Sequence, residues 1–226
     1  MSSFAIKPPA RPSIPVDGTS ALFPVRRILC VGRNYAAHAR EMGGDDRDPP
    51  FFFSKPSDAI VICPHGQCPN VPYPSATSDL HHEIELVVAL SSGGSNLTPE
   101  QGLAAIYGYA VGVDLTRRDL QNGFKAKGQP WDAAKGFDFS APISPIRRKA
   151  NCPPLQDQAG RAQGRIWLED MIWTIGETIA QASQLWTLEP GDLIFTGTPE
   201  GVGKIDRTQV VHGGIDGFGE VLFRLS

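Results

Sequence analysis

Apolar residues along this chain form short runs that are separated by glycine, proline and polar residues. A short apolar run bounded by turn-forming residues is typical of a buried β-strand. On this criterion, strands are predicted over residues 27–31, on either side of a Lys-Pro turn within 51–62, and over 84–90, 107–115, 192–197 and 219–226.

Helical patterns are fewer and mostly short. A capping-box pattern of Thr98 and Gln101 predicts a helix over residues 98–106. In residues 170–186, apolar side chains recur at intervals of three and four, which predicts the longest helix of the chain. Shorter helices are predicted over residues 35–43 and 116–124.

The order of these elements indicates the fold class. Strands outnumber helices and do not alternate regularly with them, which argues against a doubly wound α/β fold and favours a β-rich α+β roll or barrel. Residues 1–25 contain several prolines and are expected to form an irregular N-terminal arm. Residues 26–226 contain no repeat or linker and are expected to form one domain.

Composition and charge exclude several classes of protein. The 226 residues carry a formal net charge of -3 without long runs of either sign, so neither nucleic acid nor a membrane surface is an expected partner. No segment reaches the roughly 20 consecutive apolar residues that span a bilayer. The first residues lack the apolar stretch of a signal peptide, so a cytoplasmic protein is expected.

Two motifs suggest other chemistry but match it poorly. Cys63, His65 and Cys68 resemble a zinc cluster, but a fourth ligand is missing and the intervening proline and glycine favour a turn. Residues 197–203 resemble a phosphate-binding loop, but the Gly-Lys pair at its end is not followed by Ser or Thr. This glycine turn still offers backbone amides and the hydroxyl of Thr198 to an anionic ligand.

The strongest chemical signal is a group of acidic residues on apolar strands. Glu83 and Glu85 alternate with apolar residues, so a strand would place both carboxylates on one face. Asp114 ends another apolar strand, where a lone acid would be costly. A divalent cation relieves the repulsion between such carboxylates, and oxygen ligands suit Mg²⁺, Mn²⁺ or Ca²⁺. The alternative is a solvent-facing edge strand on which glutamates alternate.

His38 and Glu41 are candidates for acid–base chemistry. They lie three residues apart on the predicted helix over 35–43 and therefore share one of its faces. A histidine that is oriented by a carboxylate can take a proton from water. The alternative is an ordinary surface contact on an exposed helix. Lys135 also has two possible roles at this point: it could bind an anionic group, or it could be an ordinary exposed lysine.

Six segments, in this order, resemble the fumarylacetoacetate hydrolase family, and above all its short bacterial branch of fumarylpyruvate hydrolases and the related acylpyruvases. The resemblance extends from about residue 27 to the C-terminus. The segments are ILCVGRNYAAHAREMG, FFFSKPSDAIV, DLHHEIELVVAL, GYAVGVDLTRRDLQ, GQPWDAAKGFDFSAP and GDLIFTGTPEGVG.

The resemblance implies a fold, a cofactor and a set of site residues. The fold would be a mixed β-sandwich roll with a few short helices, and the protein would be a homodimer. The metal, either Mg²⁺ or Mn²⁺ or else Ca²⁺, would be held by Glu83, Glu85 and Asp114. The remaining site residues would be the water-activating dyad of His38 and Glu41, the substrate-bordering Arg118, Gln121 and Lys135, and Thr198, which would contact a substrate carboxylate.

The chain departs from the family pattern at one place. Between Ile166 and Met171 the family usually has a strand, an Asn-Gly turn and a second strand, whereas this sequence leads directly to the predicted long helix. One hairpin is therefore expected to be missing, although no metal or dyad position falls in this segment.

The implied reaction is hydrolysis of a 2,4-dioxo acid, such as 3-fumarylpyruvate, to fumarate and pyruvate in gentisate-type aromatic catabolism. The metal would act as a Lewis acid, His38 would deprotonate the attacking water, and Lys135 or Gln121 would stabilise the oxyanion. Two alternatives stay open. An oxaloacetate decarboxylase or keto–enol isomerase of the same superfamily would use the metal but no attacking water, and a catalytically silent protein would only bind the metal.

Overall fold

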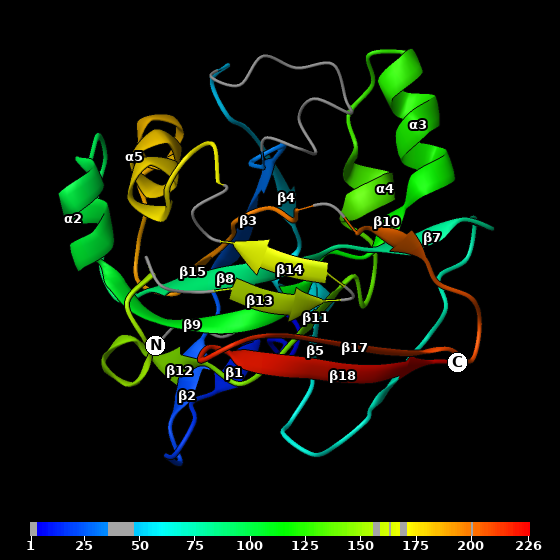
Figure 1. The fold of residues 1–226 in the computed structure, drawn as a ribbon, viewed down its shortest axis with the longest axis horizontal. Coiled ribbons are helices and arrows are strands. Elements are labelled where there is room, and N and C mark those ends of the chain that lie inside the picture. The colour runs from blue at the N-terminus through cyan, green and yellow to red at the C-terminus, as the bar shows by residue number, and fades with distance from the viewer. Residues whose placement is uncertain (1–3, 36–47, 156–158, 163, 168–170, 200) are drawn as a thin grey trace.

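The computed structural model describes residues 4–35, 48–155, 159–162, 164–167, 171–199 and 201–226. In it the chain forms an eight-stranded sheet, a five-stranded sheet, and two smaller sheets of three and two strands. The described helices lie toward the top of the view in Figure 1, and strands of the five-stranded sheet lie toward the bottom. This arrangement confirms the predicted β-rich α+β fold.

The eight-stranded sheet contains parallel and antiparallel pairs. Its central strand β8 (Ile84–Leu90) pairs antiparallel with β9 (Ile106–Val113) and with β15 (Asp192–Phe195). Parallel pairing joins β15 to β3 (Arg27–Gly32). The remaining strands are β4 (Phe51–Lys55), β5 (Ile60–Ile62), β11 (Ala141–Ile143) and β12 (Arg147–Arg148).

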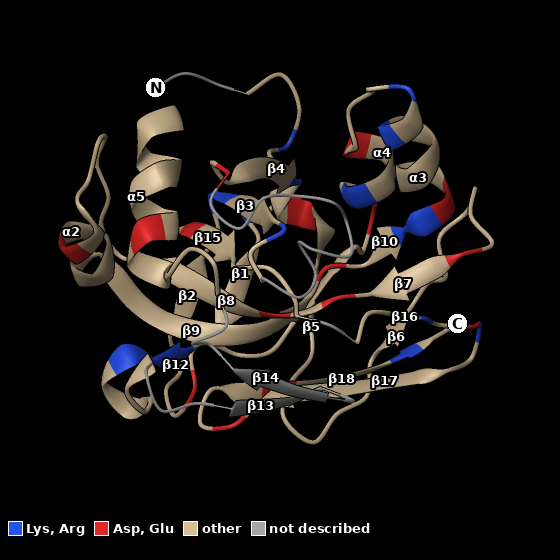
Figure 2. Cartoon of the chain, turned by 45° about the horizontal axis from the view of Figure 1, so that its top comes forward, with Lys and Arg blue, Asp and Glu red and all other residues tan. Residues whose placement is uncertain are grey.

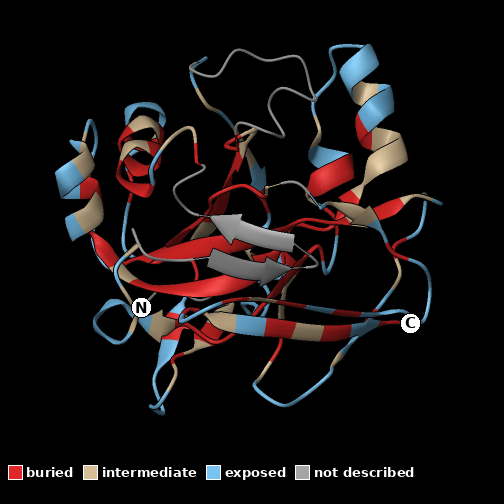
Figure 3. Ribbon diagram, in the orientation of Figure 1, coloured by how far each residue is buried: buried red, intermediate tan, exposed pale blue. Residues whose placement is uncertain are grey.

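The five-stranded sheet packs closely against the larger one. Tyr109 of β9 meets Phe218 edge to face, with ring centroids 5.2 Å apart. Gly213 approaches so closely that a Cβ there would lie 2.1 Å from Cδ1 of Ile84. Buried strand segments lie on both sides of this interface (Figure 3), which confirms the sandwich. The strands are β6 (Asn70–Val71), β13 (Ala159–Ala162), β14 (Gly164–Trp167), β17 (Val210–Ile215) and β18 (Gly219–Leu225).

The three-stranded sheet joins distant segments beside the carboxylates. Strand β7 (Leu80–His82) lies between β10 (Thr116–Arg117) and β16 (Gly203–Lys204). Pairing of Thr116 with His81, and of Gly203 with His82, therefore brings the ends of three separate chain segments to one place.

The helices match the predicted order with small shifts. Helix α5 (Ile175–Leu185) begins later than predicted because Thr174 and Glu177 form a capping box at its start. Of the helix predicted over residues 35–43, only Tyr35 is described, and it forms an antiparallel bridge with Met171. The other helices are α2 (Pro99–Ala104), which packs against α5, α3 (Arg118–Ala126), α4 (Asp132–Lys135), and the 3₁₀ turns Ser57–Ala59 and Lys149–Asn151.

The N-terminal segment is more regular than predicted. Strands β1 (Ser13–Pro15) and β2 (Leu22–Pro24) form an antiparallel ribbon within the stretch expected to be irregular. Its prolines lie at strand ends, where a missing amide donor is tolerated. Ile14 and Phe23 are buried against the larger sheet, because this short ribbon carries enough apolar surface to cover part of that sheet. The boundary at residue 25 stays a prediction.

The hairpin expected to be missing between Ile166 and Met171 stays a prediction, because residues 168–170 lie outside the described part of the chain. A hairpin does precede this segment: β13 and β14 pair antiparallel, and β13 also pairs with β17. The sequence contains few apolar residues in β13, which explains why no strand pattern was visible there. No helix in the described part of the chain has the length and apolar character needed to cross a bilayer.

Candidate metal centre and adjoining cavity

Three carboxylates meet where β8 and β9 lie side by side. The pairing places Ile84 opposite Val113, and the amide of Asp114 donates to the carbonyl of Glu83 at 2.8 Å. One oxygen from each of Glu83, Glu85 and Asp114 can be chosen so that all lie within 4.8 Å of one another. The predicted ligand set is therefore gathered by the pairing of two strands.

Burial excludes the alternative of an exposed edge strand. Glu85 is only 2% exposed, and its strand is flanked by β9 and β15. Buried carboxylates are costly unless cations or hydrogen-bond donors accompany them. The surroundings of the cluster must therefore provide positive charge.

Lys135 supplies part of that charge from the end of α4. Its Nζ donates to Glu83 at 2.9 Å, to Asp114 at 2.6 Å and to the hydroxyl of Thr116 at 2.7 Å. An ammonium group has three protons, so these bonds use all of them. In this arrangement Lys135 holds two of the carboxylates in place and has no proton left for an oxyanion.

Two further cations complete the surroundings. The guanidinium of Arg118 donates to Glu83 in a short ion pair. Nζ of Lys55 lies 2.8 Å from Oδ1 of Asp114, but donates its hydrogen bonds to backbone carbonyls, including that of Lys135. Asp114 Oδ1 is thus buried with the Lys55 ammonium as its charge partner, although no hydrogen bond of good geometry reaches it from the described residues.

Burial and the neighbouring charges shift the pKa values of the two glutamates in opposite directions. Burial alone would raise the pKa of Glu83, but Lys135 and Arg118 outweigh it and lower that pKa to about 2. The pKa of Glu85 is raised well above its usual value by burial and by the neighbouring Asp114 and Glu83. For Lys135, burial lowers the pKa, but Asp114 and Glu83 outweigh it and leave the pKa raised.

These observations fit a divalent cation. Asp114 presents a buried oxygen that only the Lys55 ammonium accompanies among the described residues. Glu85 has no ion-pair partner among those residues, although the amide of Gly197 donates to it at 2.7 Å. The donors are all carboxylate oxygens, which suits Mg²⁺ or Mn²⁺ better than zinc. The cluster is able to bind such a metal.

Binding of Mn²⁺ is expected to release a proton from Glu85, because its raised pKa keeps the metal-free carboxyl protonated to a higher pH. The affinity for Mn²⁺ should rise with pH until Glu85 is ionised in the metal-free protein, and then level off. Calorimetry in buffers of different ionisation enthalpy would measure the released proton. An affinity that does not change with pH would contradict this prediction.

The same linkage predicts how stability depends on pH. A carboxyl whose pKa is raised by folding stabilises the metal-free protein while protonated, and this stabilisation is lost as pH rises through that pKa. At a metal concentration of about 100 times the Kd, binding should add about 2.7 kcal/mol, which corresponds to roughly 5–10 °C in Tm. The difference in Tm between Mn²⁺ and EDTA samples should therefore widen with pH, and equal Tm values throughout would contradict the assignment.

The predicted substrate-binding residues border this cluster. Arg118 and Gln121 lie on α3, where the guanidinium of Arg118 also donates to the side-chain oxygen of Gln121. The hydroxyl of Thr198 donates to the carbonyl of Ile84 at 2.9 Å. All three residues line a small cavity over the carboxylates, and their contact with a substrate stays a prediction. His38 and Glu41 lie outside the described residues, so the predicted dyad is not placed.

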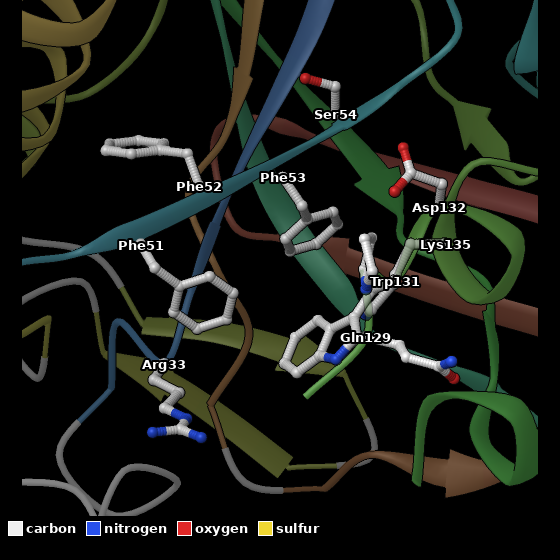
Figure 4. Close-up of a pocket in the computed structure, with 10 residues that line it drawn as sticks. Arg33, Phe51, Phe52, Phe53, Ser54, Gln129, Trp131, Asp132 and Lys135 are labelled. Atoms are coloured by element: carbon white, nitrogen blue, oxygen red, sulfur yellow. The ribbon is translucent and has the colours of Figure 1, made fainter. Parts of the chain in front are cut away.

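A larger cavity of about 580 Å³ adjoins the metal site. Phe51, Phe53 and Trp131 line both cavities, with Arg33 and Lys135 beside them (Figure 4). Its volume is in the range typical of small-molecule sites. The aromatic side chains provide an apolar wall directly next to the carboxylates.

Sequence reasoning missed several of these residues. Lys55 ends an aromatic strand and is 2% exposed, and a charged residue in so apolar a segment was a usable signal. Arg33 and Trp131 lie in two of the segments that resemble the family, but nothing in the local sequence pattern indicates that they line a common cavity. The charged residues elsewhere are interspersed in sign along the chain (Figure 2).

Comparisons with known proteins agree with this geometry. Residues 27–225 match the family model described as fumarylacetoacetate (FAA) hydrolase C-terminal. The crystal structure of fumarylpyruvate hydrolase from Pseudomonas aeruginosa in complex with Mn²⁺ and pyruvate is 45% identical to this chain, with a TM-score of 0.93. The match covers 99% of each chain.

Curated relatives are named for other reactions. The mitochondrial oxaloacetate decarboxylase of Dictyostelium discoideum is 37% identical over 198 residues, which cover 85% of this chain and 89% of the relative. The oxaloacetate tautomerase YcgM of Escherichia coli is 38% identical over 190 residues, which cover 81% of this chain and 85% of the relative. The names of these similar proteins thus include a hydrolase, a decarboxylase and a tautomerase.

Proposed function

Since the chain belongs to the fumarylacetoacetate hydrolase family, we propose that it is a metal-dependent hydrolase that cleaves the C3–C4 bond of a 2,4-dioxo acid. Its proposed substrate is 3-fumarylpyruvate, which yields fumarate and pyruvate. The observation that carries this proposal is the buried cluster of Glu83, Glu85 and Asp114 beside an aromatic cavity with room for an acyl group.

The residues around the cluster would bind the dioxo acid. Glu83, Glu85 and Asp114 would hold a divalent cation, which would supply a Lewis acid for the oxygens of the substrate. Arg118 and Thr198 border the same small cavity and would contact the substrate carboxylate. Lys135 would keep Glu83 and Asp114 in position, as its hydrogen bonds to both indicate.

The hydrolytic step needs a base and an oxyanion donor. His38, oriented by Glu41, would take a proton from water as the water oxygen bonds to C4. Gln121 is the better donor to the C4 oxyanion, since its amide has no described acceptor, whereas the protons of Lys135 are all used. The C3–C4 bond then breaks with its electron pair moving to C3. The proton held by His38 passes to C3 and gives pyruvate, while C4 becomes the carboxyl carbon of fumarate.

The relatives support a second candidate function. Two of them are named oxaloacetate decarboxylase and oxaloacetate tautomerase. Neither reaction needs an attacking water, so the same metal cluster would be sufficient without His38. The same site could therefore act on oxaloacetate, either in place of hydrolysis or in addition to it.

We also propose a cellular setting for the protein, on the basis of the family resemblance. The protein would act as a cytoplasmic homodimer in gentisate-type aromatic catabolism. Light scattering after size-exclusion chromatography would measure the mass in solution, and a monomer at working concentration would contradict the dimer.

Assay of the purified protein with Mn²⁺ or Mg²⁺ would test the function. The substrates are fumarylpyruvate, acetylpyruvate, fumarylacetoacetate and oxaloacetate, and the products are measured by chromatography. Fumarate and pyruvate should form in equal amounts from fumarylpyruvate, and EDTA should stop the reaction. Turnover of oxaloacetate alone would replace the proposal with the second candidate.

A further inference from the structure

The cavity beside the metal centre is lined by aromatic rings, and a cationic side chain lies beside two of these rings. The rings of Phe51 and Trp131 meet edge to face, with centroids 5.1 Å apart, and Phe53 lies 6.2 Å from Trp131. Nζ of Lys135 lies 5.1 Å from the Phe53 centroid, and the guanidinium of Arg33 lies 5.8 Å from the Phe51 centroid. A ligand that extends from the metal centre would therefore pass the aromatic rings.

Arg33 differs from the other cations near the carboxylates. Lys55, Lys135 and Arg118 are all engaged by acidic groups, whereas Arg33 has no ion pair within the part of the chain that the structure describes. Its Nε is buried without a hydrogen-bond partner among those residues. A buried donor without an acceptor is costly, so a ligand that supplies an acceptor would bind favourably here.

The backbone presents Arg33 in a fixed position. Its φ of 58° lies in the left-handed region, which non-glycine residues adopt rarely and usually where the surroundings impose it. The next residue, Asn34, is buried and donates to the carbonyls of Trp173 and Thr196. On the other side, Gly32 lets the ring of Phe51 lie against the chain, since a Cβ there would be 2.2 Å from that ring.

Among the described residues that line the cavity, the only charged group besides Arg33 and Lys135 is Asp132. Figure 4 shows Asp132 on the side of the drawn residues away from Arg33. An anionic end of a ligand would be repelled near Asp132 and attracted near Arg33. The charges thus favour one direction for a ligand that carries an anion.

We propose that Arg33 determines specificity by binding a carboxylate at the far end of the substrate's acyl group, while Phe51, Phe53 and Trp131 stack against a planar acyl chain. This inference rests on the proposed function and narrows it. Among acylpyruvates, the enzyme selects those with an unsaturated, flat acyl group that ends in a carboxylate. Guanidinium is suited to this task because it forms paired hydrogen bonds to a carboxylate.

Kinetics with matched substrates would test this. Fumarylpyruvate, its neutral ester at the distal carboxyl, and acetylpyruvate share the dioxo head and differ in the acyl end. Arg33→Gln should raise KM for fumarylpyruvate by roughly 10- to 100-fold, the worth of a hydrogen bond to a charged group, with less effect on kcat. For the ester and acetylpyruvate, KM should change by less than about twofold. Arg33→Lys, which keeps the charge, should recover part of the loss, and Arg148→Gln on the exposed surface is the control.

Three outcomes would overturn the inference: equal losses on all three substrates, no loss on any of them, or no preference of the unaltered enzyme for fumarylpyruvate over its ester. Calorimetry with the Mn²⁺-loaded protein separates this from failure of the proposed function. If fumarylpyruvate binds with an affinity that depends on Arg33 but is not cleaved, the proposed function is wrong and the inference stands.

Discussion

Replacing Glu85 with glutamine is expected to abolish metal-dependent turnover. Glutamine keeps the size of the side chain and can still accept the hydrogen bond from Gly197, but it removes one negative ligand. Changes to residues that only support a metal ligand cost about 10- to 100-fold in metal affinity or activity, so loss of a ligand itself should cost at least about 100-fold. Titration with Mn²⁺, followed by calorimetry and by initial rate, would measure the effect.

A stability measurement distinguishes this loss from misfolding. Since Glu85 is buried and its pKa is raised in the metal-free protein, a neutral glutamine should leave the metal-free Tm unchanged or higher. Glu220→Gln changes an exposed carboxylate on β18 and serves as the control. Normal activity of Glu85→Gln in the presence of EDTA would show that the metal site is assigned wrongly.

Replacing His38 with alanine is expected to separate hydrolysis from decarboxylation. Hydrolysis of acylpyruvates needs a base for the attacking water, and loss of a general base typically costs about 10²–10⁴-fold. Decarboxylation of oxaloacetate needs no such water, so any such activity should fall much less. Rates on fumarylpyruvate and oxaloacetate would be compared at saturating Mn²⁺.

The control for this substitution is His212→Ala, which changes a histidine that is largely exposed on β17. It should leave both activities within about twofold of the unaltered protein. An equal loss of both activities in His38→Ala would mean that His38 contributes to substrate binding and is not the base for water.

The clustering of the three proposed metal ligands could be predicted because local chain geometry determines their arrangement. Glu83 and Glu85 are two residues apart, so the alternation of a strand is sufficient to put them on one face. Asp114 directly follows a strand of strong apolar character, and that strand pairs with the neighbouring one. The strands themselves were predicted for the same reason, since short apolar runs are recognisable without knowledge of the fold.

The cations around the ligands could not be predicted in the same way. Lys135 reaches Glu83 across 52 positions of sequence, and its contact depends on where α4 lies against the small sheet. No local pattern encodes that packing. The resemblance implies only that Lys135 borders the substrate, and the structure adds that its ammonium donates to Glu83 and Asp114.

The ribbon of β1 and β2 belongs to the folded unit, although it precedes the first residue of the family match. The match begins at residue 27, but the apolar underside of the large sheet, which includes Val87 and Phe195, is covered by Ile14 and Phe23 from earlier in the chain. A shortened chain that starts at residue 27 would leave these side chains in water and lose the hydrogen bonds that join Pro15 and Asp17 to Ile146. Because Glu85 shares its strand with Val87, a distortion spreading from that face would reach the metal ligands. Preparations meant for kinetics should therefore retain the whole ribbon, even though none of its residues lines the active-site cavities.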